Sequence, residues 1–168
     1  MVKFLLRALQ VLMVTALPVY AEDLSVPEGD VILTVWGAIG ATNVDGKAQF
    51  DLGMLEAIGD RTVVTSTIWT DGPQTFLGVS LNLLVKRLGV SGDVLRARSI
   101  NDYYVDIPVS DAIEGGPIIA YKVNGDVMLV RNKGPLWVVY PYDENPEYRS
   151  EVIYSRSIWQ LDRIEVIN

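Results

Sequence analysis

Any chemistry in this chain must proceed without histidine or cysteine, because the 168 residues contain neither. That composition excludes Ser-His-Asp and Cys-His catalysis. It also removes the ligands that nearly every zinc site uses. The polar and aromatic residues that remain as candidates for binding fall into three short clusters: Thr65, Ser66 and Trp69; Asn101, Asp102 and Tyr103; and Arg131 with Lys133.

The second and third clusters have the right groups to recognise a polar ligand. Asn101 and Asp102 offer short, fixed amide and carboxylate side chains next to the ring of Tyr103. An Asx turn at the same position would account for these residues without a ligand. Arg131 and Lys133 lie close together in an acidic chain and could clamp an anion, or they could only make the surface soluble.

Tryptophan is the third indicator of a binding site. Trp69, Trp137 and Trp159 each have polar neighbours in the sequence. A buried indole N–H usually finds a hydrogen-bond partner, so these residues could line a pocket for a small organic ligand. Packing in the core is the alternative.

The N-terminus has the pattern of a secretory signal peptide. Lys3 and Arg7 supply positive charge, an apolar run follows over residues 8–16, and Pro18 comes before small residues that end at Ala21. Cleavage after Ala21 would leave a single domain of residues 22–168. We therefore expect a periplasmic or secreted protein with no membrane span in its mature chain, because no later apolar run is long enough.

The charge balance limits the partners. Cleavage would leave 12 basic and 21 acidic side chains, a net charge of −9, against −7 for the whole chain. Nucleic acid and anionic membranes bind cationic faces, so neither is expected as a partner. Without cysteine, stability must come from the core alone, which is feasible at this length.

Strands are predicted to outnumber helices. Asp51 as a cap and Gly59 as a stop favour a helix over residues 52–58. An apolar stripe between a Ser80 cap and a Gly89 stop favours a second helix over residues 81–88. An Asn-Gly pair at 124–125 predicts a hairpin. The predicted fold class is α+β, with short helices and a mixed, mainly antiparallel sheet. The strands are expected at residues 31–36, 48–50, 62–68, 94–100, 103–107, 118–123, 127–131, 137–140 and 164–166.

Several segments, taken in order, resemble the oxidoreductase molybdopterin-binding domain, the fold of the sulfite oxidase family. The resemblance covers roughly residues 69–167. Any one segment is weak, but six in the same order are fairly specific. They are TIWT at 67–70, FLGVSLNLLVKRLGV at 76–90, NDYYVDIP at 101–108, the Asn-Gly hairpin, GPLW at 134–137 leading to Tyr140-Pro141, and WQL at 159–161.

The resemblance implies the family's fold and a molybdopterin pocket beside residues 101–103. Catalytic members hold molybdenum through a cysteine just before the segment that corresponds to 76–90. Here that neighbourhood offers only the hydroxyls of Thr65, Ser66 and Thr67, which are poor ligands for a soft metal.

We therefore expect a small exported relative, most simply without cofactor, although molybdopterin is possible by resemblance. It would act as a binding, sensory or accessory module, either for a small anionic or pterin-like ligand or for a periplasmic or membrane receptor. A molybdopterin-dependent oxidoreductase, or an accessory subunit of one, is the alternative.

Overall fold

A computed structural model describes residues 24–168 of the chain. The predicted signal peptide, residues 1–21, lies outside the described residues. Ten strands form one sheet: β1 (Leu33–Gly37), β2 (Ala48–Phe50), β3 (Asp60–Thr65), β4 (Gln74–Ser80), β5 (Val94–Ser99), β6 (Tyr104–Pro108), β7 (Ile118–Val123), β8 (Asp126–Val127), β9 (Leu136–Val139) and β10 (Trp159–Ile167).

The helices are short and lie between the strands. They comprise three α-helices and three 3₁₀ turns: α1 (Leu52–Ile58), α2 (Leu81–Leu88), α3 (Glu151–Arg156), η1 (Val109–Asp111), η2 (Val130–Asn132) and η3 (Pro146–Tyr148). None of the helices between residues 24 and 168 has the length and apolarity that crossing a membrane requires.

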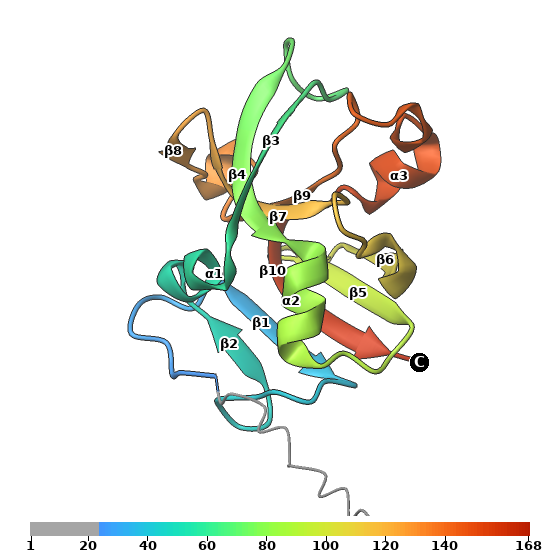
Figure 1. Cartoon of the computed structure of the whole chain (residues 1–168). Helices are drawn as coiled ribbons and strands as arrows, with labels where there is room; N and C mark the ends of the chain where they lie inside the picture. The colour runs from blue at the N-terminus through green and yellow to red at the C-terminus, as the bar shows by residue number, and fades with distance from the viewer. Residues whose placement is uncertain (1–23) are drawn as a thin grey trace, which may run out of the picture.

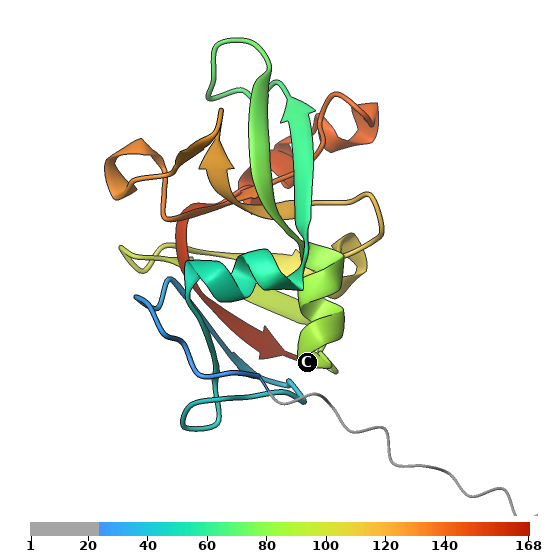
Figure 2. The same ribbon diagram turned by 60° about the vertical axis from the view of Figure 1, so that its left-hand side comes forward.

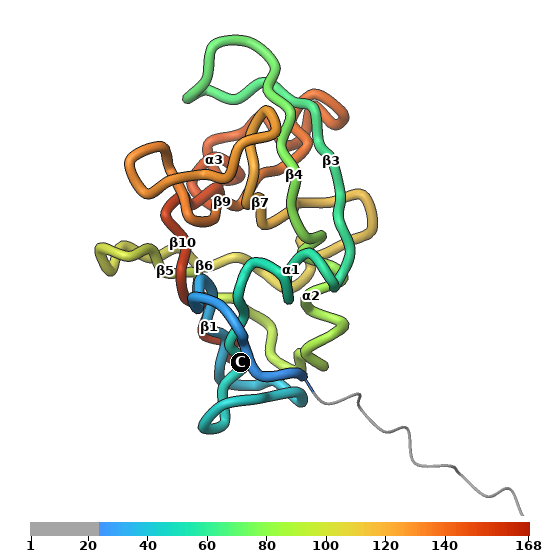
Figure 3. Tube along the Cα trace, turned by 90° about the vertical axis from the view of Figure 1, so that its left-hand side faces the viewer, coloured from blue at the N-terminus to red at the C-terminus, as the bar shows by residue number. Residues whose placement is uncertain are grey.

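The strand order along the main path is β2-β1-β10-β9-β7-β4-β3, with β5 joined to β10, β6 to β5 and β8 to β7. Strand β1 pairs with β10 in parallel, and the other pairings in the described chain are antiparallel. The sheet bends strongly, so the β3–β4 hairpin extends at one end of the molecule and β1 and β2 lie at the other (Figures 1 and 3). Helices α1 and α2 lie side by side (Figure 2).

Aromatic side chains make up much of the bulk of the core. Tyr121, Tyr140, Tyr142, Phe50 and Phe76 are among its largest fully buried residues. Aromatic side chains bury large areas, so a few of them supply much of the hydrophobic stabilisation that a cysteine-free domain needs.

The predicted α+β class, the mainly antiparallel sheet and both predicted helices are confirmed. Helix α1 begins after Asp51, whose carboxylate accepts the Met54 amide at 2.8 Å, and ends at Gly59. Helix α2 ends at Gly89 in the left-handed conformation, although Ser80 makes no side-chain capping bond. The Asn-Gly pair forms the turn between β7 and β8.

Two strands end earlier in the structure than the sequence predicts. The strand expected to reach residue 68 ends at Thr65, because the Thr67 hydroxyl accepts the Trp69 amide and bonds the hydroxyl of Thr70, which folds the chain into a turn. The strand expected over 127–131 ends at Val127. The chain then turns into η2, because the Leu129 carbonyl accepts two later amides, those of Asn132 and Gly134.

Strand β4 and helix α3 were not predicted. Strand β4 ends where the predicted helix over residues 81–88 begins, in residues for which no strand or helix was predicted. Helix α3 directly follows residues 143–150, a polar segment that predicts a loop. It begins at Ser150, whose hydroxyl accepts the Ile153 amide at 3.4 Å.

Asp51 joins the start of the described chain to helix α1. Its second carboxylate oxygen accepts the amides of Glu28 and Gly29, each at 2.8 Å. The amide bonds, that of Gly29 first, hold the pKa of the Asp51 carboxyl below its usual value of 3.8. The charged carboxylate therefore stabilises the folded chain above that value, and the contribution is lost as the pH falls through the lower folded-state pKa.

We expect Asp51→Asn to lower the urea midpoint at pH 7, because the neutral amide is a weaker acceptor for three backbone amides. The gap to the unmodified chain should be constant well above pH 3.8, the usual value for this carboxyl, and should close as the pH falls through the lower folded-state pKa of Asp51. Urea unfolding followed by circular dichroism across this pH range measures it. Asp71→Asn in an exposed turn is the control, and an equal shift for both variants would contradict the assignment.

Candidate functional site

A cavity of about 500 Å³ opens where four separate segments of the described chain meet. We call it the aromatic cavity. It lies between the turn after β3, the β5–β6 turn, helix α3 and the first residues of β10. Its lining residues are Trp69, Ser99, Asn101, Tyr103, Tyr154, Ser155, Ser157, Ile158, Trp159 and Gln160.

Three tryptophans and a tyrosine form one edge-to-face cluster along the cavity. The ring of Trp69 lies 5.3 Å from that of Trp159, 5.8 Å from Tyr154 and 5.9 Å from Trp137, measured between centroids. Trp137 is buried and donates its indole N–H to the Ser157 carbonyl at 3.2 Å. Within residues 24–168, no hydrogen bond forms from the indoles of Trp69 and Trp159. Those two N–H groups remain available to a ligand.

Asn101 presents its amide nitrogen at the cavity. Its side-chain oxygen accepts the Ser99 hydroxyl at 2.5 Å and the Tyr103 amide at 3.4 Å, which is the predicted Asx turn. Asp102 adopts a positive φ of 66° between them. Because the oxygen is fixed inside the turn, the NH₂ group is left as a donor, with no partner in the described part of the chain. The turn and the recognition role are therefore compatible.

Lys133 lies against the rings of Trp137 and Trp159, which we call the tryptophan wall. Its ammonium is 5.7 Å from the ring centroids of both Trp137 and Trp159, close enough for cation–π attraction. The Lys133 carbonyl accepts the Gln160 amide at 2.8 Å, so the backbone of this residue also fixes the cavity edge.

Helix α3 is tied to the core through Ser157. The Tyr142 hydroxyl donates to the Ser157 hydroxyl at 2.5 Å, which in turn donates to the Ile153 carbonyl at 2.8 Å. Burial raises the pKa of Tyr142 to about 12, so its phenol remains a donor at ordinary pH. This chain of bonds positions Tyr154 against Trp69 and so completes the cavity wall.

A second, smaller hollow of about 310 Å³ lies next to the aromatic cavity and shares Tyr154 with it. Ser66 lines this hollow beside Asp143 and Arg149. The Ser66 amide donates to Asp143 at 2.6 Å, and the Arg149 guanidinium donates to the other oxygen of that carboxylate, also at 2.6 Å. These contacts, the Ser66 amide first, lower the pKa of the Asp143 carboxyl.

Thr65 is fully buried and its hydroxyl is already used. It accepts the Asp143 amide at 3.1 Å and donates to the Ser66 carbonyl at 3.3 Å. The bond from the Asp143 amide fastens the end of β3 to the segment after β9, whereas the bond to the Ser66 carbonyl is local. The side chain is a structural bridge between these two segments.

The structure therefore brings together only part of the predicted site. Trp69, Asn101 and Tyr103 line the aromatic cavity, and Lys133 contacts its tryptophan wall. The other four predicted residues lie elsewhere: Thr65 in the core, Ser66 in the second hollow, Asp102 in an ion pair with Arg163 at 2.9 Å, and Arg131 in the exposed turn η2.

Sequence reasoning missed the contribution of α3 and of the residues around it. Tyr154 and Ser155 lie on α3 and Ser157 ends it, in residues for which no strand or helix was predicted. Gln160 reaches the cavity through a positive φ of 53°, which only the fold imposes. Two aromatic residues close together, Tyr154 and Trp159, with Ser155 and Ser157 between them, were the available signal, because pockets commonly combine aromatic walls with a few polar groups.

Comparison with known proteins bears on the fold. No protein-family model matches the chain, and no curated protein matches it. Among solved structures, the chain is similar to the sulfane dehydrogenase SoxCD from Paracoccus pantotrophus, with a TM-score of 0.59 and 16% sequence identity. The match covers 80% of this chain and 37% of the other. This likeness shows a shared fold and agrees with the sulfite oxidase-like fold expected from the ordered segments.

The side chains present do not fit a thiolate-held molybdenum centre. The candidates for the missing thiolate are hydroxyls, and that of Thr65 is used in two hydrogen bonds. A protonated hydroxyl is a weak donor to a soft metal. In the described part of the chain, no three carboxylates gather in a way that could hold a metal ion. The aromatic cavity is lined by neutral side chains alone.

The link between Asp143 and the turn after β3 can be tested. We expect Asp143→Ala to speed hydrogen exchange at the Ser66 amide, because that N–H loses its acceptor and Arg149 loses its ion pair. Exchange at the core strands β7 and β9 should stay unchanged. Amide exchange followed by NMR measures both, and Glu147→Ala on the nearby η3 is the control. Unchanged protection at Ser66 would show that the carboxylate does not hold the turn.

Proposed function

We propose that this chain is an exported binding module that holds a small, ring-containing molecule in the aromatic cavity, without catalytic molybdenum. The observation that carries the proposal is the lining itself. Indole and phenol rings surround the space, and a free amide donor, Asn101, lies among them. Pockets of a few hundred Å³ with apolar walls and a few placed polar groups are typical small-molecule sites.

The geometry favours a flat ligand with polar edges. The rings of Trp69 and Trp159 stand edge to face with an interplanar angle of 79°, so a planar molecule can stack on one and meet the edge of the other. The amide of Asn101 and the hydroxyl of Tyr103 then supply hydrogen bonds to ring nitrogens, carbonyls or hydroxyls. A pterin or a similar heterocycle has this combination of features.

Charge near the cavity favours an anionic substituent. Arg131 and Lys133 have no carboxylate partner within 4 Å in the described part of the chain, whereas most other arginines are paired there. No Asp or Glu lines the cavity. A ligand that carries a carboxylate or phosphate would therefore meet the ammonium of Lys133, which contacts the ring of Trp159.

An exported module with this site would act through another protein, which would bind the module differently with and without its ligand. A periplasmic or membrane receptor is the partner we favour. Support comes from the exposed apolar residues near the cavity, since Tyr103 is 59% exposed and Ile68 is 61% exposed. Exposed apolar side chains next to a binding site commonly belong to contact surfaces.

A molybdopterin-dependent oxidoreductase, or an accessory subunit of one, is the second candidate. The likeness to a sulfane dehydrogenase favours it. It needs a mode of holding the metal that uses no thiolate, and the contacts of Thr65 and Ser66 give it no support.

Ligand binding should stabilise the chain. At a concentration one hundred times its dissociation constant, a specific ligand adds about 2.7 kcal/mol, which raises the melting temperature by on the order of 5 °C for a domain of this size. We expect such a shift with pterin-6-carboxylate, a smaller one with neutral pterin and none with acetate. Differential scanning fluorimetry measures it.

Adjacent tyrosines provide the matched control. Tyr103→Leu removes a cavity ring and should abolish the shift, whereas Tyr104→Leu, on a residue that packs between Arg96 and Arg98, should leave it intact. Asn101→Ala should weaken binding of every ring compound, and Lys133→Gln should weaken only the carboxylate form. If the two tyrosine variants behave alike, the ligand does not occupy this cavity.

Molybdenum analysis separates the two candidate functions. We expect protein purified from an exporting host with intact cofactor synthesis to contain far less than one molybdenum per chain, because no thiolate is present to hold it. Metal analysis by mass spectrometry, together with pterin fluorescence of the denatured protein, gives both quantities. Near-stoichiometric molybdenum would favour the oxidoreductase instead.

A further inference from the structure

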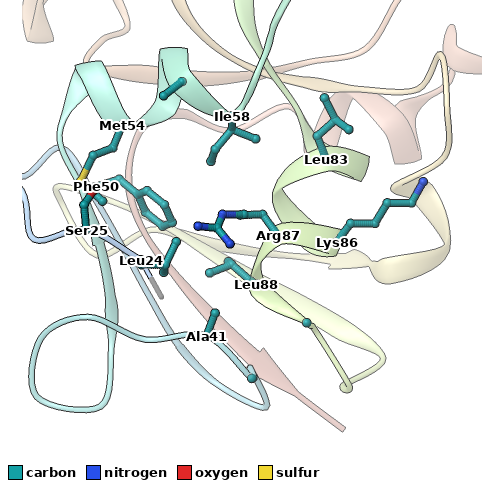
Figure 4. A pocket seen from close by; sticks show the side chains of 13 residues that line it. Leu24, Ser25, Ala41, Phe50, Met54, Ile58, Leu83, Lys86, Arg87 and Leu88 are labelled. Atoms are coloured by element: carbon teal, nitrogen blue, oxygen red, sulfur yellow. The ribbon is translucent and has the colours of Figure 1, made fainter. Parts of the chain in front are cut away.

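The two larger openings in the described chain differ in the rings that line them. One, of about 780 Å³, lies between helices α1 and α2 and shares no lining residue with the aromatic cavity (Figure 4). Among its lining residues within 24–168, Phe50 is the only aromatic one. A benzene ring gives up an electron far less readily than an indole or a phenol does. The rings that are most easily oxidised by one electron therefore line the aromatic cavity and not this second opening.

Indole and phenol rings form an unbroken series from the aromatic cavity into the core. Trp159, which is 37% exposed, lies 5.3 Å from Trp69, and Trp69 lies 5.8 Å from Tyr154, measured between ring centroids. The series continues from Tyr154 to Tyr142 at 5.4 Å and from Tyr142 to Tyr140 at 6.3 Å. We call these five rings the aromatic series. Because electron tunnelling falls off exponentially with distance, separations this short permit fast stepwise transfer between oxidisable rings.

The inner end of the aromatic series has a base for its proton. The hydroxyl of the fully buried Tyr140 donates to the Asp111 carboxylate at 2.7 Å, and the Arg156 guanidinium donates to the same oxygen at 2.8 Å. Burial above all, and then the hydrogen bond to Asp111, raises the pKa of the Tyr140 phenol, so it keeps its proton at rest. A phenol that loses an electron becomes a strong acid, and the hydrogen bond lets its proton move to the carboxylate. Tyr142, by contrast, donates to the neutral hydroxyl of Ser157.

We propose that the aromatic series carries an electron from Tyr140 to Trp159 when a small oxidising radical removes one from that indole, and so protects the cavity wall from oxidative damage. As the electron leaves, the hydroxyl proton of Tyr140 moves to Asp111, which gives an intact Trp159, a Tyr140 phenoxyl radical and a protonated Asp111. A small reductant such as ascorbate then returns one electron through the half-buried Tyr148, whose ring lies 5.4 Å from that of Tyr140, and Asp111 returns the proton. Oxygen adds readily to indolyl radicals and only slowly to phenoxyl radicals, so the transfer moves the radical to the less vulnerable ring.

Pulse radiolysis of a chain that carries Trp36→Phe tests the transfer. Of the four tryptophans, Trp36 alone makes no ring contact with the others in the described structure, so this substitution leaves the three clustered ones. Azidyl radicals oxidise indole in preference to phenol at neutral pH, and the indolyl and phenoxyl radicals absorb at different wavelengths. We expect the indolyl signal to decay as the phenoxyl signal grows, at a rate that does not depend on protein concentration. Decay without phenoxyl growth, or a rate proportional to protein concentration, would overturn the proposal.

Variants along the aromatic series separate electron transfer from packing. Tyr154→Leu keeps an apolar side chain but removes a ring in the middle of the series, so the concentration-independent phase should be lost. Ile153→Ala, on the same helix and also packed against the core, should leave that phase unchanged. Tyr140→Phe should lower the phenoxyl yield, and Asp111→Asn should slow phenoxyl growth, because an amide is a poor proton acceptor. Unchanged kinetics in Tyr154→Leu, or an unchanged yield in Tyr140→Phe, would contradict the assigned route.

A second readout measures the protection itself. Each variant is first checked for folding by circular dichroism and thermal unfolding. After steady exposure to azidyl radicals with ascorbate present, peptide mass spectrometry should find more oxidised Trp69 and Trp159 in Tyr154→Leu than in Ile153→Ala. Equal tryptophan oxidation in these two variants would contradict the protective role. Ligand binding is scored separately by Tyr103→Leu, outside the aromatic series, so the two proposals can fail independently.

Discussion

The fold depends on the way strand β10 changes partners along its length. Its first residues pair with β9, Trp159 opposite Trp137, and its remainder lies between β1 and β5. The register shifts between Trp159 and Leu161, and Gln160 takes a positive φ at the shift. This irregular point joins the two ends of the bent sheet. It also directs Trp159 and Gln160 into the aromatic cavity, so the constraint that holds the sheet together shapes the site.

Buried polar contacts also hold the walls of the aromatic cavity in place. Ser157 joins Tyr142, Ile153 and Trp137, and Thr65 joins the turn after β3 to Asp143. In the described chain, no buried side-chain polar atom lacks a partner. Because removing one partner would leave a buried group unsatisfied, such contacts fix one arrangement of α3 and the turn. Two segments far apart in sequence are thereby held as opposite walls of one cavity.

The sequence predicted elements whose signals are local. Asp51 and Gly59 mark both ends of α1, and the Asn-Gly turn marks a hairpin, because capping and turn chemistry act within a few residues. Strand β4 was not predicted, because its apolar residues continue without a break into the apolar residues of α2. Helix α3 has no buried residue and so no apolar stripe to find. Trp69, Asn101 and Tyr103 could be predicted for the site, whereas Gln160 depends on a backbone conformation that only the assembled sheet imposes.

The side chains that line the aromatic cavity agree with the proposed binding role. Hydroxyls stand near the position where the family resemblance requires a thiolate, and Thr65 uses its hydroxyl as a structural bond. Neutral residues line the aromatic cavity, so it holds no side-chain group ready to exchange a proton at neutral pH. The rings of Trp69 and Trp159 and the amide of Asn101 offer stacking and hydrogen bonding, which are the interactions that the proposed binding role requires.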